Sequence, residues 1–389
     1  MNAPIVVGID MGTYGTAVSY SKPLKSNPNR CGTVFTTSQW PSGGPETKVP
    51  TRIAYRNENH GHFGFGNDDF VWGFRVQPGM TASSWFKLHY NRAAAFTEYS
   101  DQKMNGGLEP GPITWPEATI SSFETAVKRA GFGQRPIDQL DGTTEPVAAM
   151  YYMAPKLATQ LRVGEGVVIC DVGGGTTDIC SFRITGNGAR FQWEAIQTNH
   201  VGGRCAGAAV DCHLYRLLVE RFGPAFQNLP IALKAPGSAL MNASEGVKRD
   251  FAEGSGEPRQ LPLPMDPGLL PNSPYYDSSR GLIRITRQDL YDCFNPVINE
   301  IIKLVNLQFG LTEMQAPSLN IRRLAFVGGL LNSSYVRGRL GVAFQNRPLL
   351  EVVIPDQPYV CFRLVLSKRS SFHSQLAVTK GAVLYKTVN

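Results

Sequence analysis

A chain of 389 residues, 42% of them hydrophobic, is long enough to bury a large core and predicts two or three domains. The sequence has no run of about eighteen apolar residues, and its N-terminus MNAPIVVGIDMG lacks a basic segment followed by a long apolar one, so we expect neither a membrane span nor a signal peptide. Its cysteines are odd in number and form no CxxC pair, which favours free thiols in a reducing compartment and predicts a cytoplasmic protein.

The net charge of +7 is concentrated near the C-terminal end of the sequence. Residues 321–389 carry ten Lys and Arg against Glu351 and Asp356, a local net charge of +8. These cations are spread over predicted helices and strands, and no module of alternating aromatic and basic residues accompanies them. We therefore expect a solvated face that also attracts an anionic nucleotide, and no nucleic-acid site.

Near the N-terminus, Ile5–Tyr20 (IVVGIDMGTYGTAVSY) predicts a strand, a glycine turn and a returning strand. Asp10 ends the first strand and Gly12 lies in the turn. On its own, one Asp-x-Gly hairpin is a weak functional signal.

The region between residues 49 and 153 predicts a short strand and two helices, and it contains one lysine in an apolar segment. Val49–Tyr55 is the strand, and Ser121–Gly131 and Gly142–Met153 are the helices. The second helix opens on Glu145 and a proline, which suits a first helical turn. Lys87 lies among aromatic and apolar residues, either as a helix residue whose stem covers apolar surface or as a phosphate contact in a cleft.

Val167–Phe182 (VVICDVGGGTTDICSF) repeats the N-terminal pattern with an offset of 161 residues, which lays Asp10 on Asp171. Its three consecutive glycines let backbone N–H groups approach a ligand without Cβ clashes. Such a turn suits phosphate oxygens, and Asp171 and Asp178 flank it with carboxylates that suit a metal ion or a water. A lone segment of this kind is more typical of an ordinary glycine-rich hairpin. Two of them, facing each other, predict a site that binds a polyphosphate from both sides.

After the second hairpin, Gly202 and Gly203 precede a predicted helix over Ala208–Phe222, an arrangement that suits an anion. Ser244–Phe251 predicts a short amphipathic helix. Its Glu245, Lys248 and Arg249 fall on one face, where intrahelical ion pairing is the alternative to ligand binding.

The last third of the sequence predicts a proline-rich surface excursion over 254–281, then a helix that begins at Thr286 and Asp289 and is kinked at Pro296. Leu324–Leu340 predicts a buried strand, a turn at Gly328-Gly329 and a helix. This turn is a third place where a backbone can approach a flat ligand such as a base or ribose.

Taken in chain order, these motifs resemble the nucleotide-binding region of the seventy-kilodalton heat-shock chaperones (DnaK type) over essentially the whole sequence, from Ile5 to Tyr385. The motifs are DxGT, EPxAA, DxGGGTxD, ExxK, VGGxxxSxYV and the final AVTKGAVLY. WFKL, EPVAA and VGGLLNSSYV are more narrowly similar to a divergent eukaryotic branch, frequent in fungi, that is related to heat shock 70 kDa protein 12. The resemblance implies an α/β protein of the actin-like ATPase (ribonuclease H-like) fold, with two lobes that each hold a mixed five-stranded sheet and helices around a nucleotide cleft.

The resemblance also implies a division of the chain. Lobe I takes residues 1–160, with a peripheral subdomain at 51–111 and a hinge helix that returns at 375–389. Lobe II takes residues 161–374, with a peripheral subdomain at 204–316 that includes the proline-rich loop. An apparent insertion occupies 359–376.

The cofactors that the resemblance implies are ATP or ADP with Mg²⁺. Matched motif by motif, the catalytic residues are Lys87, Glu145, Asp171 and Asp178. Asp10 and Asp171 hold the metal through waters. The nucleotide contacts are Asp10, Gly12, Thr13, Tyr14, Gly173, Gly174, Gly175, Thr176, Gly202, Gly203, Glu245, Lys248, Arg249, Gly328, Gly329 and Asn332.

The sequence departs from the family pattern around the base. Leu330 and Asn332 replace the usual Ser and Arg of the adenosine loop, which removes the guanidinium that stacks on adenine. Ala252 stands where a serine is frequent, and Trp85 replaces a common acid two residues before Lys87. These changes alter base affinity and leave the phosphate-binding residues in place.

The function we expect is ATP binding with slow Mg-dependent hydrolysis that drives lobe closure, in a chaperone-related or regulatory role. Its partners are a co-chaperone, an exchange factor or a client protein. Because the sequence ends at Asn389, we expect no peptide-binding domain. The alternatives are a non-hydrolysing nucleotide-sensing scaffold (a pseudo-ATPase), a small-molecule kinase and an actin-like filament former.

Overall fold

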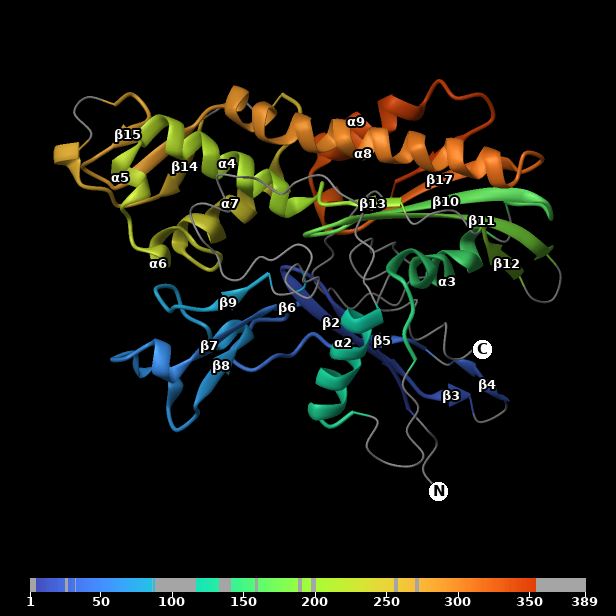
Figure 1. Ribbon diagram of the computed structural model, residues 1–389, viewed down its shortest axis with the longest axis horizontal. Coiled ribbons are helices and arrows are strands. Elements are labelled where there is room, and N and C mark those ends of the chain that lie inside the picture. Colours follow the sequence, from blue (N-terminus) through green and yellow to red (C-terminus); the bar gives the residue numbers. More distant parts are fainter. Residues whose placement is uncertain are drawn as a thin grey trace.

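The computed structural model describes residues 5–24, 27–31, 33–85, 87, 117–132, 141–157, 160–187, 191–196, 201–254, 258–269 and 273–354. The predicted hinge helix at 375–389 and the apparent insertion at 359–376 lie outside these residues. The protein is a mixed α/β structure with several sheets (Figure 1). In that view, strands β1 to β9 and α2 lie in the lower half, and the elements from β10 onward lie in the upper half.

The N-terminal hairpin is the centre of an antiparallel sheet. Its two strands pair in the register that sets Asp10 opposite Ala17, which confirms the hairpin predicted over Ile5–Tyr20. The two other described strands of this sheet pair with opposite ends of the second strand. The members are β1 (Val6–Met11), β2 (Gly15–Ser21), β5 (Phe35–Thr36) and β6 (Val49–Pro50).

A small three-stranded antiparallel sheet follows β6 directly along the chain and has a core of its own. That core packs Ala54, Phe65, Val71, Val76 and Met80. The remaining described elements before residue 132 are a two-stranded ribbon, one α-helix and three short 3₁₀ helices, η1 (Arg56–Glu58), η2 (Phe63–Phe65) and η3 (Gly73–Arg75). The strands of the small sheet are β7 (Arg52–Tyr55), β8 (Phe70–Trp72) and β9 (Ser83–Ser84). The ribbon is formed by β3 (Pro23–Leu24) and β4 (Asn27–Cys31), and the α-helix is α2 (Glu117–Arg129).

The largest sheet is mixed and contains the second hairpin, which confirms the hairpin predicted over Val167–Phe182. The two hairpin strands are antiparallel, whereas the next two strands continue the sheet in parallel. Its order is β12–β11–β10–β17–β18, with β13 also paired to β11. The members are β10 (Glu165–Val172), β11 (Thr177–Asn187), β12 (Phe191–Ala195), β13 (Val201–Gly203), β17 (Asn320–Val327) and β18 (Glu351–Val353).

Strand β10 is buried on both faces of this sheet, because alternate side chains of a strand point in opposite directions. Val168 and Cys170 belong to the larger core, which includes residues of helices α4, α8 and α9. Val167 and Ile169 belong to a second core that includes residues of α3. Helices therefore cover both faces of the sheet, with α8 and α9 on one side and α3 on the other (Figure 1).

The helices begin close to the capping signals in the sequence. The helix that begins at Glu145 agrees with the prediction. The helix predicted over Ser244–Phe251 is longer, because Ser238 accepts a hydrogen bond from the N–H of Met241 and starts it earlier. The helices are α3 (Glu145–Leu157), α4 (Gly207–Phe222), α5 (Pro224–Gln227), α6 (Ile231–Lys234), α7 (Ala239–Asp250), α8 (Arg287–Gln315) and α9 (Ser334–Phe344).

The proline-rich excursion predicted over 254–281 contains regular structure. Two of its segments form a three-stranded antiparallel sheet with the strand that follows it. Prolines are tolerated here because the strands are short and Pro262 is the last residue of its strand. The strands are β14 (Arg259–Pro262), β15 (Tyr276–Asp277) and β16 (Leu282–Ile285).

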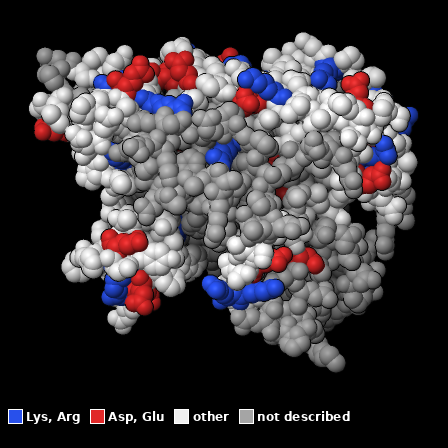
Figure 2. Space-filling view, viewed as in Figure 1, with Lys and Arg blue, Asp and Glu red and all other residues white. Residues whose placement is uncertain are grey.

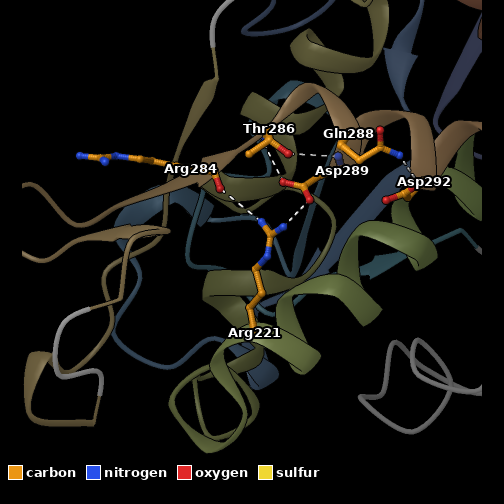
Figure 3. Close-up of polar contacts among 6 residues, drawn as sticks. All are labelled: Arg221, Arg284, Thr286, Gln288, Asp289 and Asp292. Atoms are coloured by element: carbon orange, nitrogen blue, oxygen red, sulfur yellow. Dashed lines mark hydrogen bonds and ion pairs between the residues drawn. The ribbon is translucent and has the colours of Figure 1, made fainter.

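The N-terminus of α8 is held by an ion pair from α4 (Figure 3). Thr286 and Asp289 form a reciprocal capping box, as their positions in the sequence predict, and Arg221 pairs with the Asp289 carboxylate. Arg221 also donates to the carbonyl of Arg284 and lies over the ring of Tyr275. Since α8 and α4 pack on the same face of the large sheet, this contact fixes one helix against the other. The helix continues through Pro296.

The strand counts differ from the expected five in each main sheet. Among the described residues, the N-terminal sheet has four strands and is antiparallel, and the large sheet has six. The extra strand arises because β11 is eleven residues long, so that β12 and β13 pair with different parts of it. No helix in the described part of the chain combines the length and the apolar character that crossing a bilayer requires.

Candidate functional site

The turns of the two hairpins meet. An ideal Cβ placed on Gly174 would lie 2.6 Å from Cδ2 of Tyr14, so the ring from the first turn packs directly on the backbone of the second. Any side chain at position 174 would displace that ring. Glycine is therefore required here by a contact between two turns that are far apart in the sequence.

Four carboxylates gather beneath these turns. Asp171 lies opposite Asp178 in the hairpin register, and its side chain is almost fully buried. Burial, followed by the charges of Glu145 and Asp10, raises the pKa of Asp171 well above its usual value. Asp178 adds to this effect and accepts a hydrogen bond of 2.8 Å from the hydroxyl of Thr176. The four predicted acids are thus close enough to influence one another's ionisation.

Lys87 supplies positive charge to this cluster. Its ammonium forms an ion pair with Glu145, the first residue of α3. Burial alone would lower the pKa of Lys87, but the charges of Glu145 and Asp10 outweigh burial and raise it, so the ammonium stays protonated. The structure therefore brings together all four residues predicted to be catalytic.

A second lysine, Lys48, was not singled out from the sequence. Its Nζ lies 2.9 Å from Oδ2 of the buried Asp10. It immediately precedes β6, which pairs with β2 next to the first turn. No local pattern marks this lysine, because its position depends on the pairing of β6 with β2.

Tyr14 crosses from the first turn to a buried polar group in α4 and α7. Its hydroxyl donates to the carboxylate of Asp211, and Nζ of Lys248 lies 2.8 Å from the same carboxylate and 4.7 Å from the centre of the Tyr14 ring. Burial, followed by the charge of Asp211, raises the pKa of Tyr14 well above its usual value, so the phenol remains a donor. Trp85 packs edge-on against the ring.

Asp211 was also missed from the sequence, although a signal for it exists. It lies on the same helical stripe as Ala208, Tyr215 and Leu218, which are all buried. An acid on the apolar stripe of a helix needs a polar partner, and such a position is a reason to look for one.

The three charged residues predicted on α7 pair with one another. Glu245 accepts from Lys248 at 2.8 Å and from Arg249 at 3.0 Å. Intrahelical pairing, the alternative considered from the sequence, is therefore present. Lys248 is nevertheless buried and reaches Asp211, whereas Arg249 remains partly exposed.

The turn after β17 lies against Asp171. An ideal Cβ on Gly328 would lie 2.3 Å from the Val172 carbonyl oxygen and 2.4 Å from Oδ1 of Asp171, and the φ of Gly328 is +107°. Both facts require glycine. The next residues form a 3₁₀ helix, η7 (Gly329–Asn332), which contacts α7. Asn332 is buried there, and its Oδ1 has no hydrogen-bond partner.

The remaining predicted glycine and threonine positions divide into two groups. Gly12, Gly173, Gly175, Thr13 and Thr176 lie in the two turns; a Cβ on Gly12 would lie 2.7 Å from the Gly15 carbonyl oxygen, and the Gly173 N–H donates to the Thr176 carbonyl. Gly202 pairs with Asp178 across the sheet. Gly203, however, packs against Leu304 of α8, and Gly329 has open space around its Cα. None of the four acids is among the nearest neighbours of an ideal Cβ at either of these two positions.

On the surface, positive and negative side chains are mixed. On the face drawn in Figure 2, Lys and Arg side chains of the described residues are interspersed with Asp and Glu. Several arginines in and after β17 are paired, as Arg322 is with Glu165 and Arg323 is with Glu351.

In the described residues, no group of three or more His, Cys, Asp or Glu side chains is arranged to hold a metal ion. No protein-family model matches the chain, and no curated protein matches it either. The functional argument therefore depends on the geometry of this site.

Proposed function

We propose that the protein binds ATP between the two glycine turns and hydrolyses it slowly with Mg²⁺, as an actin-like ATPase of the heat-shock-70 type. The observation that carries this proposal is the convergence of Asp10, Glu145, Asp171 and Asp178 with two lysines beneath two glycine turns. Backbone N–H groups and ammonium groups suit phosphate oxygens, and carboxylates suit a divalent cation.

A hydrated Mg²⁺ ion keeps its own waters and does not need a cluster of direct protein ligands. Asp171 is buried and has neither an ion pair nor a side-chain hydrogen bond within the described structure, although three other carboxylates surround it. An uncompensated buried carboxylate favours a cation. Asp171 and Asp10 would hold the ion through waters, since Mg²⁺ usually keeps several of its own. When bound, the metal neutralises charge on the phosphates.

The chain's own residues would position the attacking water and supply fixed charge near the phosphates. Hydrolysis of a phosphoanhydride needs an aligned water and stabilised charge more than covalent help. Lys87 is half-buried, protonated and held by Glu145, so it offers a fixed positive charge. Glu145 and Asp178 are the acids available to orient a water, and Thr176 holds the Asp178 carboxylate in place.

The output of this site would be a change in how the two halves of the molecule contact each other. Tyr14 lies in the first turn, and its partners Gly174, Asp211 and Lys248 follow residue 160. A ligand bound between the turns would alter these contacts. We propose a chaperone-related or regulatory protein in the cytoplasm that passes this closure to a co-chaperone, an exchange factor or a client.

The test is a single-turnover ATPase assay combined with calorimetry. Asp171→Asn and Lys87→Ala should each lower phosphate release by at least about tenfold. Asp69→Asn, which alters an exposed surface acid, should leave it unchanged. Turnover that persists in both site variants would contradict the proposal.

A second function, a non-hydrolysing nucleotide sensor, is favoured by one observation. Two of the four acids, Asp10 and Glu145, are already paired with lysines. These two carboxylates are then less available to organise a metal and a water. Tight ATP binding in calorimetry without phosphate release over hours would select this function.

A further inference from the structure

Lys48 lies beside the first glycine turn. Its Nζ is 4.0 Å from the position of an ideal Cβ on Gly12, and its Cβ is 3.1 Å from that of an ideal Cβ on Gly15. The Lys48 stem thus follows the turn, and its ammonium reaches the end of β1. That is the side of the turn from which Asp10 enters the acidic cluster.

The segment that carries Lys48 is fixed to this turn by several bonds. β6 pairs with β2 at Gly15 and Thr16. The N–H of Thr51 donates to the Tyr14 carbonyl at 2.9 Å, and the hydroxyls of Thr51 and Thr16 are 2.9 Å apart. Lys48 therefore differs from a flexible surface lysine, because its backbone cannot move without breaking the sheet. Its side chain is 29% exposed, against 8% for its partner Asp10.

The charges of the cluster show what this ammonium does. Two lysines lie among the four acids, and each is paired with a different one: Lys48 with Asp10 and Lys87 with Glu145. Without Lys48, the buried Asp10 would have no ion pair, and a polyphosphate entering the site would meet an unpaired carboxylate at the first turn. The positive charge of Lys48 offsets that repulsion, and unlike a metal ion it cannot dissociate, because it is covalently part of the chain.

We propose that Lys48 is a tethered cation that neutralises Asp10 when Mg²⁺ is absent, so that this protein binds ATP with little dependence on Mg²⁺. The inference rests on the proposed function, since it concerns the same nucleotide site. Hydrolysis still requires the metal, because Asp171 has no such partner. Binding and hydrolysis would then differ in their need for Mg²⁺.

The experiment measures ATP affinity of the full chain by calorimetry, once with Mg²⁺ and once with EDTA. For the unaltered protein we expect the two affinities to agree within about threefold. For Lys48→Met, affinity in EDTA should fall about tenfold to a hundredfold, the range of a charge-assisted hydrogen bond, and Mg²⁺ should restore most of it. Lys48→Arg, which keeps the charge, should behave like the unaltered protein.

Lys303→Met is the matched control, because Lys303 pairs with Glu300 on the exposed face of α8. It should change neither affinity. Urea unfolding of each variant shows whether loss of the Lys48–Asp10 pair has only destabilised the fold. If Lys48→Met does not fold, the ATP affinities of the unaltered protein in Mg²⁺ and in EDTA still test the inference.

The outcomes separate the two proposals. No binding of ATP even with Mg²⁺ overturns the proposed function and this inference with it. Binding with Mg²⁺ that EDTA abolishes in the unaltered protein overturns only the inference. Equal binding in both buffers by the unaltered protein and by Lys48→Met shows that Lys48 is a structural residue, and this also overturns the inference.

Discussion

The phenol of Tyr14 donates a hydrogen bond to the carboxylate of Asp211, which lies 197 residues further along the chain. This bond joins the first hairpin turn to helix α4 behind the large sheet. The same carboxylate also pairs with Lys248 through its Oδ2, while its Oδ1 has no hydrogen-bond partner. The bond is therefore one of the places where the N-terminal sheet and the rest of the molecule are held together.

Tyr14→Phe should lower the free energy of unfolding by about 1–3 kcal/mol, because it removes a donor from a buried carboxylate and leaves the ring in place. Urea denaturation measures this change. Tyr20→Phe is the control, since Tyr20 lies on β2 with 40% of its surface exposed and its ring stacks on Phe35. Equal stability of the Tyr14 and Tyr20 variants would mean that the hydrogen bond contributes nothing.

Asp171→Asn should stabilise the nucleotide-free protein while it removes ATPase activity. Burial and the neighbouring acids raise the pKa of Asp171, so its contribution to stability is present below its unfolded pKa and is lost as the pH rises through its folded pKa. At neutral pH the charged form is therefore unfavourable. We expect a gain of at least about 1 kcal/mol in urea unfolding without metal. A variant less stable than the parent at neutral pH would show that the Asp171 carboxylate does not destabilise the folded protein.

Asp289→Asn should have the opposite pH dependence. Burial alone would raise the pKa of Asp289, but the hydrogen bonds from Arg221 and Thr286 outweigh it and hold the pKa below its usual value. The stability it contributes is therefore present above the unfolded pKa and lost as the pH falls through the folded pKa. We expect a loss of about 1–3 kcal/mol at neutral pH, measured by urea unfolding, that shrinks in acid.

The control for this prediction is Asp292→Asn, one turn further along α8 (Figure 3). Asp292 is exposed and accepts only from Gln288 on the same helix. It should change stability by less than about 0.5 kcal/mol at either pH. A loss at Asp289 that did not vary with pH would assign its effect to helix capping alone.

Gly328→Ala should destabilise the protein by more than about 2 kcal/mol and abolish nucleotide binding. Its Cβ would overlap the Val172 carbonyl oxygen, and its φ of +107° is unfavourable for alanine. Gly338→Ala is the control, because this glycine lies within α9 and has open space around it. That change should stabilise the helix by about 0.5–1 kcal/mol. Thermal unfolding distinguishes the two.

The sequence by itself determined the local elements that hold the site. Both hairpins follow from an apolar strand, a glycine turn and a β-rich return, and the capping box at Thr286 follows from its own spacing. The convergence of two similar turns was predictable from their internal repeat. These features depend on neighbours a few residues apart, which is the range over which backbone propensity and capping act.

Only the tertiary structure decided which side chains meet. Lys48 reaches Asp10 because β6 pairs with β2, and Tyr14 reaches Asp211 because α4 packs behind the large sheet. Gly328 is irreplaceable because β17 runs parallel to β10 and ends beside Asp171. Each of these contacts joins residues that are distant in the chain, and their geometry arises from strand pairing and helix packing, which no local pattern specifies.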